Sequence, residues 1–294
     1  MNKLASPAAF KRLRTNRDSE SAVDTADRAY RGQQLASQSD SRLFVNSVEK
    51  AMRVLHTVGA ADRPLTIAEI AAVTRLGRSA SQRFLYTLER LGYLLRDRQT
   101  LRYRLSPRVL GFSSSYLWHD DAVLRFPDHF AEINHKTGES VTLSELDGTE
   151  IVVVARLPGR HMFSVNIFTG MRFPAFCNSA GRAILAFLPD DEARAIIDRT
   201  ERTAFTAHTI TDKAAIAAEL AKARTRGYAI AEQESVADTI SLAVPVLGPG
   251  GRPLAAVNLY VPLSRWPRQR LETELAQPMI KAARAMAAEV LGTK

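Results

Sequence analysis

Several features that would place this chain among secreted or membrane proteins are scarce or missing. Its 294 residues include one cysteine, Cys177, which excludes an intrachain disulfide and favours a reducing compartment, the cytoplasm. No apolar run approaches the roughly 18 residues that a membrane helix needs. The N-terminus also has no apolar signal-peptide core, so we expect neither a membrane span nor secretion.

Motifs of common catalytic and cofactor sites are missing too. The sequence has no Gly-rich dinucleotide motif, no P-loop, no nucleophile elbow and no metal-ligand spacing of histidines, so we expect no cofactor and no metal. Cys177 precedes an expected helix start, where a thiol pKa can fall. Nucleophilic catalysis needs a base, and no Cys-His motif lies nearby. We therefore expect a protein that is not an enzyme, with an enzyme that uses Cys177 as the alternative.

Positive charge is concentrated in the N-terminal part of the chain. Residues 1–116 hold 20 Lys and Arg against 10 Asp and Glu, whereas residues 117–294 hold 20 against 21. All of the net charge of +9 therefore lies in the first part. Such a footprint is typical of a domain that neutralises DNA phosphates.

One amphipathic helix is predicted over residues 78–91, inside this basic part. Its core face has helical spacing and consists of Ser81, Phe84, Leu85 and Leu88. The opposite face is polar and basic, with no acid before Glu89, and consists of Arg78, Ser79, Gln82, Arg83 and Tyr86. These donors match base edges and phosphates, so we expect this face to enter the major groove of duplex DNA.

The flanking residues predict a winged helix-turn-helix. Thr66 and Glu69 have capping-box spacing at the start of a shorter helix, and Gly77 is expected to supply the turn before the long one. After Gly92, two alternating segments around a turn at residues 97–100 predict a hairpin. We expect Thr66 and the hairpin residues Arg102 and Arg104 to contact DNA as well. A small helical core with solvated arginines is the alternative.

The rest of the chain predicts an α+β protein of two domains. We expect a disordered basic tail at residues 1–41, the winged helix-turn-helix at 42–106, a linker helix at 107–119 and an effector-binding domain at 120–294. Ser106 and Pro107 predict the start of the linker helix. In the second domain the alternating segments predict strands at 140–146, 150–156, 161–166, 228–232, 241–247 and 253–260, with helices between them and a closing helix at 269–291.

A small-ligand site is predicted in the second domain. Small residues follow Cys177 at an expected helix start, where backbone N–H groups attract an anion such as a carboxylate. Ser241, Asn258 and Tyr260 are polar positions in otherwise apolar strands, and the last two share a face. Ordinary sheet residues with satisfied hydrogen bonds are the alternative.

The chain resembles the IclR family of transcriptional regulators over roughly residues 42–292. The resemblance is carried by these blocks: SVEKA at 47–51, LTIAEIA at 65–71, RSASQRFL at 78–85, LGYL at 91–94, YRLSPRVL at 103–110, TGESV at 137–141, NSAGRA at 178–183, RGYA at 226–229 and LAVPV at 242–246. It implies a winged helix-turn-helix, a linker helix and a mixed α/β, GAF-like effector-binding domain. It also implies homodimers, often paired into homotetramers, on palindromic operators.

The resemblance also implies positions for the ligand. The backbone of Ser179 and Ala180 would bind a carboxylate, beside Cys177. The matching side-chain positions are Ala231, Ser241, Asn258 and Tyr260. Relatives that bind small acids such as glyoxylate carry Asp in place of Ala231 and small hydroxyl residues in place of Asn258 and Tyr260. This difference speaks against a glyoxylate-like ligand and is compatible with another effector, such as an aromatic acid. Phe168, Phe173 and Phe176 are further candidate lining residues.

We therefore expect a ligand-responsive, DNA-binding transcriptional regulator of a catabolic operon, whose effector is a small organic acid, with an aromatic acid as one candidate. Two rivals are an enzyme with a DNA-binding appendage and an architectural DNA-binding protein without an effector. Turnover that is lost in Cys177→Ala would favour the first, and binding to DNA regardless of sequence would favour the second.

Overall fold

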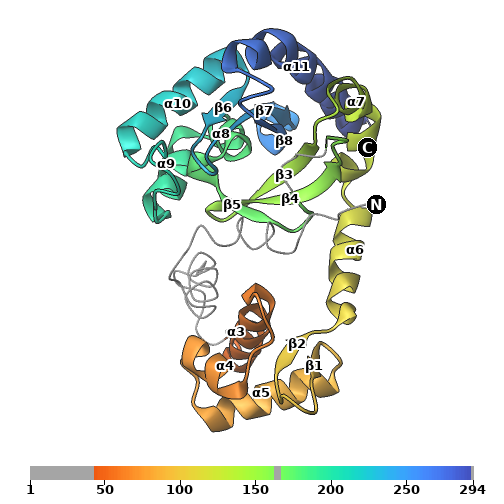
Figure 1. The fold of residues 1–294 in the computed structure, drawn as a ribbon, viewed down its shortest axis with the longest axis vertical. Helices are drawn as coiled ribbons and strands as arrows, with labels where there is room; N and C mark the ends of the chain where they lie inside the picture. The colour runs from red at the N-terminus through yellow and green to blue at the C-terminus, as the bar shows by residue number, and fades with distance from the viewer. Residues whose placement is uncertain (1–42, 162–166, 293–294) are drawn as a thin grey trace. The chain divides into compact units, whose positions relative to one another are not determined.

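The computed structural model describes residues 43–161 and 167–292 (Figure 1). The predicted tail at residues 1–41 lies outside them. The chain divides into two compact units, Met1–Tyr116 and Leu117–Lys294. The finer boundaries expected from the sequence, with a separate linker at 107–119, stay predictions.

The N-terminal unit is a helix-turn-helix followed by a two-stranded hairpin, as predicted. Its elements are α3 (Asn46–Ala60), α4 (Ile67–Thr74), α5 (Arg78–Arg90), β1 (Leu94–Arg96) and β2 (Tyr103–Leu105). All three helices contact one another, and the hairpin packs against α3 and α5. Their shared core consists of Val54, Val58, Leu65, Ile70, Leu85, Leu88, Leu94 and Tyr103.

The turn between α4 and α5 differs from the prediction. Arg75, not Gly77, adopts the left-handed conformation, with a φ of 54° at the end of α4. Gly77 has a φ of −59° and a ψ of 151°, which other residues adopt equally well. Gly92 ends α5 with a φ of +80°, and Tyr93 N donates to Leu88 O at 2.9 Å past the end of the helix.

The expected linker begins where its capping residues predict. Ser106 Oγ accepts from the backbone N–H of Arg108 at 3.1 Å, and Pro107 occupies the first helical position. The first turn is a 3-10 helix, η1 (Pro107–Val109), which continues into α6 (Leu110–Trp118).

The C-terminal unit is built on one antiparallel sheet of six strands in the order β5-β4-β3-β8-β7-β6. These strands are β3 (Val141–Asp147), β4 (Glu150–Leu157), β5 (Arg172–Pro174), β6 (Ala229–Glu232), β7 (Thr239–Leu247) and β8 (Pro253–Pro262). The short strand β5 was not predicted. Instead the sequence suggested a strand at 161–166, of which residues 162–166 lie outside the described residues and His161 is not in a strand.

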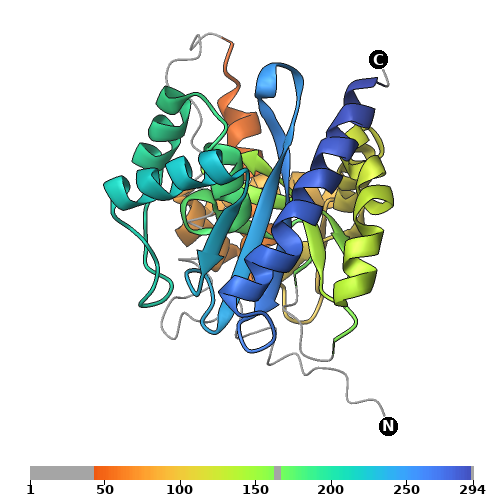
Figure 2. The same cartoon turned by 90° about the horizontal axis from the view of Figure 1, so that it is seen from above.

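Helices cover both faces of this sheet, as Figure 2 shows. On one face lie α7 (Asp121–Thr137) and α11 (Arg268–Gly292), which also contact each other. On the other face α8 (Ser179–Leu185) packs on the sheet, with α9 (Asp190–Arg199) and α10 (Lys213–Arg226) beside it. The predicted α+β effector fold, with helices packed on a sheet of hairpins, is therefore confirmed.

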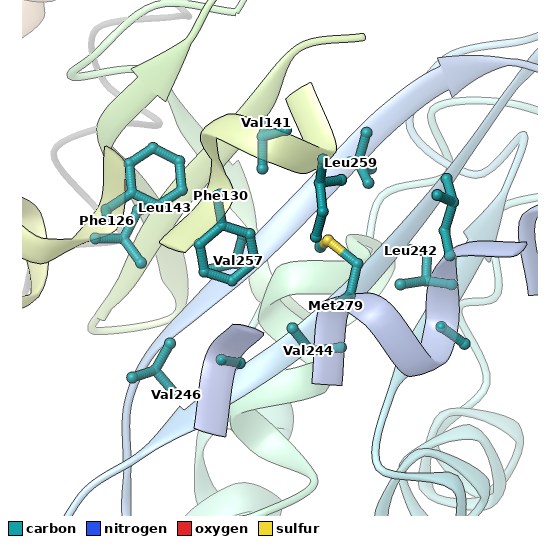
Figure 3. Packing of buried hydrophobic residues seen from close by; sticks show 14 of the residues in the cluster. Phe126, Phe130, Val141, Leu143, Leu242, Val244, Val246, Val257, Leu259 and Met279 are labelled. Atoms are coloured by element: carbon teal, nitrogen blue, oxygen red, sulfur yellow. The ribbon is translucent and has the colours of Figure 1, made fainter. Parts of the chain in front are cut away.

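Alternation along the two central strands divides their side chains between the two faces. Leu242, Val244, Val257 and Leu259 pack with Met279 of α11 in the larger core (Figure 3). Their neighbours in sequence point the other way, towards α8. Because both faces are covered, every residue of β7 up to Val246 is buried. The α8-facing residues therefore form an enclosed surface.

Candidate DNA-binding surface and effector site

The structure leaves the predicted DNA-reading face of α5 on the surface. Tyr86 is 62% exposed, whereas Leu85, its neighbour on the core face, is fully buried. The remaining predicted reading residues are also exposed: Arg78, Ser79, Gln82 and Arg83. No acid lies in the first turn of the helix. The face therefore presents two guanidinium groups, an amide, a hydroxyl and a phenol to any ligand of this helix.

Thr66 and Arg102, two further predicted DNA contacts, have partners inside the protein. Thr66 Oγ1 accepts from Glu69 N at 3.3 Å and donates to Glu69 Oε2 at 2.8 Å, which completes the predicted capping box. Arg102 Nη1 donates to Pro64 O at 3.0 Å and to Glu69 Oε2 at 3.2 Å. Arg102 thus fixes β2 to the start of α4, and its contact with DNA stays a prediction.

Glu69 is the centre of this small network. Arg63 donates to its carboxylate at 2.6 Å, and this bond is the main reason why the pKa of Glu69 falls from 4.5 to about 2. The Thr66 backbone N–H adds a bond of 2.7 Å. The network therefore holds a charged carboxylate at the N-terminus of α4, where it also interacts favourably with the helix dipole.

The hairpin presents positive charge without a free acid. Arg104 is exposed on β2, and Arg96 and Arg98 are exposed beside it. The carboxylate of Asp97 accepts hydrogen bonds within the turn, because its Oδ1 accepts from Gln99 N at 2.9 Å and from Thr100 N at 2.7 Å. The hairpin can therefore contribute phosphate contacts through Arg104.

The predicted effector residues of the strands lie together on the sheet face towards α8. Ala231, Ser241 and Tyr260 stand directly opposite one another across β6, β7 and β8, so they share one face. Asn258 belongs to the next row on that face and accepts from Ser179 Oγ at 3.2 Å. The structure thus brings Ser179 of α8 and four strand positions into one buried group.

Hydrogen bonds within this group order its side chains, and burial keeps Tyr260 neutral. Ser241 Oγ donates to Ala231 O at 3.3 Å, and Tyr260 OH accepts from Thr239 Oγ1 at 3.0 Å. Burial raises the pKa of Tyr260 to about 12. The phenol therefore stays protonated at neutral pH.

The start of α8 differs from the expectation in one respect, the backbone N–H of Ala180. The backbone N–H of Ala180, expected to bind a carboxylate, donates to Asn178 Oδ1 at 2.9 Å. Cys177 is fully buried, and burial raises the pKa of its thiol to about 12. A protonated, enclosed thiol is a poor nucleophile. These two positions act here as packing and capping elements of α8.

The three phenylalanines are not all grouped as expected. Phe176 packs in the core beneath α8, and Phe173 lies partly buried between that core and the cluster of Val153, Ile167 and Tyr260. Phe168 is 41% exposed. The expectation that all three line one cavity is therefore wrong for Phe176, because its ring fills the core with α8.

Sequence reasoning missed three groups near this site. Arg182 of α8 forms a buried ion pair with Glu234. Ser144 of β3 is fully buried on the α8 side, and its Oγ has no hydrogen-bond partner. Arg156 of β4 has a buried Nε without a partner. Arg182 lies in an expected helix, whereas Ser144 and Arg156 lie in expected strands whose register brings them to this face.

Comparison with known proteins identifies the chain as a transcription factor. Residues 47–98 match the model of the IclR helix-turn-helix domain, and residues 115–288 match that of the bacterial transcriptional regulator IclR C-terminal domain. The chain belongs to the IclR family. The Pca regulon regulatory protein of Pseudomonas putida is 30% identical over 250 residues, which cover 85% of each chain.

Solved structures support the same fold. A transcriptional regulator from Rhodococcus sp. RHA1 is 33% identical, with a TM-score of 0.72 over 85% of this chain and 99% of that one. An IclR homologue from Microbacterium hydrocarbonoxydans, solved in complex with 4-hydroxybenzoate, is 23% identical, with a TM-score of 0.63 over 84% and 98%. The chain is thus a helix-turn-helix regulator with a C-terminal effector-binding domain.

The part of the chain that the structure describes contains neither a metal-ligand cluster nor a membrane-spanning helix. Within residues 43–161 and 167–292, no group of three or more His, Cys, Asp or Glu side chains is arranged to hold a metal ion. In the same residues, no helix has the length and apolar content needed to span a membrane.

Proposed function

We propose that this IclR-family regulator binds a palindromic operator through α5 and controls a catabolic operon in response to a small aromatic acid. The observation that carries the proposal is the exposed face of α5, where Gln82, Arg83 and Tyr86 project from a helix whose other face is buried. On this proposal Arg78 and Ser79 join them in the major groove. Arg104, Arg102 and Thr66 would contact the DNA backbone.

The effector would bind at the polar positions on the sheet face that points towards α8. Ser179, Ser241, Asn258 and Tyr260 supply hydroxyl and amide groups, and the small side chain of Ala231 lies in the same row as Ser241 and Tyr260. The complex of the Microbacterium homologue with 4-hydroxybenzoate supports an aromatic acid of this size. Cys177 and Ala180 would contribute by shaping the start of α8.

Palindromic DNA requires two copies of the reading helix, so we propose a homodimer or homotetramer that acts in the cytoplasm. Exposed apolar side chains on α6 support association, because Leu110 and Phe112 are each 64% exposed and Trp118 is 72% exposed. Large apolar side chains this exposed along one helix are more typical of an interface than of a solvated helix.

The test uses DNA from upstream of the protein's own gene and of neighbouring operons. Footprinting should protect a site with two-fold symmetry, and fluorescence anisotropy should show that 4-hydroxybenzoate changes the affinity. Equal affinity for scrambled DNA would instead favour an architectural DNA-binding protein. No change in affinity with any aromatic acid, despite specific DNA binding, would refute the effector part alone.

The alternative of an enzyme that uses Cys177 has little support. Its thiol has a raised pKa and no access to solvent. The hydroxyl of Ser235 lies 3.9 Å from the sulfur and is no base. We therefore propose that the protein is not an enzyme.

A further inference from the structure

Arg156 lies on the same face of the sheet as the proposed effector residues. Its Cα stands opposite Thr142 of β3, and Thr142 stands opposite Asn258 of β8. Directly opposed residues of antiparallel strands point to the same side, so these three form one row. Neighbouring strands are about 5 Å apart, which lets a long arginine side chain reach its neighbours in this row.

The guanidinium of Arg156 lacks an acidic partner such as Arg172 and Arg182 have. Arg172 pairs with two carboxylates and Arg182 with one. For Arg156, no ion pair is formed within residues 43–161 and 167–292. Its Nη2 donates to Ser140 Oγ at 3.1 Å, while its buried Nε donates to no acceptor. One donor of a permanent cation is therefore unused.

The surroundings of Arg156 are apolar on one side. Its guanidinium carbon lies 5.6 Å from the centre of the Phe168 ring. Burial lowers the pKa of Arg156, and no carboxylate acts in the opposite direction. An arginine nevertheless stays charged at any pH of interest. A desolvated cation of this kind is stabilised by a bound anion.

Ser144 is a second, independent sign of a ligand at this face. It lies two residues from Thr142 on β3, so its side chain points to the same side. The residue is fully buried, yet its Oγ has no hydrogen-bond partner. Buried hydroxyl groups are normally bonded, so an unpartnered one beside an unpaired cation indicates a polar ligand.

We propose that Arg156 binds the carboxylate of the effector, with the apolar body of the acid lying against Phe168 and Tyr260. This inference rests on the proposed effector function of the same domain. The Ala180 N–H, expected to bind that carboxylate, already donates to Asn178. The planar guanidinium takes over this role, because its paired donors match the two oxygens of a carboxylate.

The experiment is calorimetry on the full chain with two matched probes, 4-hydroxybenzoate and its uncharged analogue 4-hydroxybenzamide. The wild type should bind the acid more tightly than the amide. Arg156→Gln should weaken binding of the acid by at least about tenfold and leave binding of the amide unchanged. Arg156→Lys, which keeps the charge but lacks the paired N–H donors of a guanidinium, should give an intermediate loss of affinity for the acid. Arg194→Gln, on the exposed surface of α9, is the matched control and should bind like the wild type.

Other outcomes would overturn the inference. If the wild type and Arg156→Gln bind the acid equally well, Arg156 does not bind the carboxylate, although the proposed effector function stays intact. Equal affinity of the wild type for the amide and the acid would likewise show that Arg156 does not recognise the carboxylate. If neither these probes nor benzoate and phenylacetate bind the wild type at millimolar concentration, the aromatic-acid effector and this inference both fail. Circular dichroism and retained DNA binding show whether each variant is folded. If Arg156→Gln does not fold, Arg156→Lys gives a second test of the inference.

Discussion

Arg182 and Glu234 form a two-pronged ion pair that is almost fully excluded from solvent. Their nitrogen–oxygen distances are 2.5 and 2.7 Å, and their side chains are 1% and 5% exposed. Arg182 Nε also donates to Phe176 O at 2.8 Å, and Glu234 accepts from Ile210 N at 3.1 Å. The pair therefore ties α8 to the segment after β6.

Removing one partner of this pair should strongly destabilise the effector domain. Glu234→Gln leaves the Arg182 charge buried without its counterion, a change that typically costs about 3–5 kcal/mol. Urea denaturation followed in the C-terminal unit measures the loss. The matched control is Glu192→Gln, which breaks the similar but exposed pair with Arg252 and should cost far less stability. Equal effects of the two changes would contradict this account.

Gly181 should not tolerate even a methyl group. A Cβ at this position would lie 2.3 Å from Ala175 O and 2.4 Å from Ala175 Cα, which are backbone atoms that cannot move aside easily. Gly181→Ala should therefore separate α8 from the turn before it and lower the thermal stability by several degrees. Gly111→Ala is the control, since nothing lies within 4 Å of its added Cβ. An unchanged melting temperature for Gly181→Ala would refute the close contact.

The DNA-binding unit should lose stability in acid through Glu69. Its folded-state pKa of about 2 lies below the ordinary value of 4.5, so its stabilising effect is complete above about pH 4.5 and is lost as the pH falls towards 2. Glu69→Gln should thus be less stable by about 1 kcal/mol at pH 7, with a difference that shrinks towards pH 2. Denaturation curves at several pH values measure this trend. Glu201→Gln, an exposed position, should show no such trend.

Arg83 should contribute to reading of the operator. Arg83→Ala should weaken binding by about 1–3 kcal/mol if the guanidinium contacts a base. Fluorescence anisotropy on the operator and on a scrambled duplex measures both affinities. An equal loss on the two duplexes would mark Arg83 as a phosphate contact instead. Arg194→Ala removes the same charge from α9 and should leave both affinities unchanged.

Cys177 should be chemically inert in the folded protein. Because burial raises its pKa to about 12, almost no thiolate exists at neutral pH. Iodoacetamide should therefore label it only after unfolding, as mass spectrometry would show. Ser114→Cys, which adds a thiol at an exposed position, is the positive control. Rapid labelling of Cys177 in the native protein would revive its interpretation as a nucleophile.

The sequence was most informative where a pattern is local. Helix α5 follows from the 3.6-residue spacing of Ser81, Leu85 and Leu88, and all three are buried. Strands β7 and β8 follow from their apolar runs. Strand β5 has only three residues and includes Pro174, so it has no periodicity to detect. The turn after α4 was assigned to Gly77 because glycine usually adopts positive φ, but the structure puts Arg75 there.

Long-range partners could not be predicted from the sequence. Arg182 and Glu234 are 52 residues apart, and no motif links them. The unpartnered Nε of Arg156 depends on the register of β4 against β3, which includes a bulge between Leu143 and Ser144. The bond from Ala180 N to Asn178 is a local cap, and it could have been anticipated because asparagine is a preferred N-cap residue.

The strand order has a consequence for how the chain is made. In the sheet β3 lies next to β8, although more than a hundred residues separate them in the chain. During synthesis one edge of β3 stays unpaired until the last strand has left the ribosome, whereas the helix-turn-helix needs only near neighbours and can fold early. An mRNA truncated before β8 would therefore give a product with a folded helix-turn-helix and an incomplete effector-binding domain. The unpaired edge of β3 in that product would be prone to aggregation.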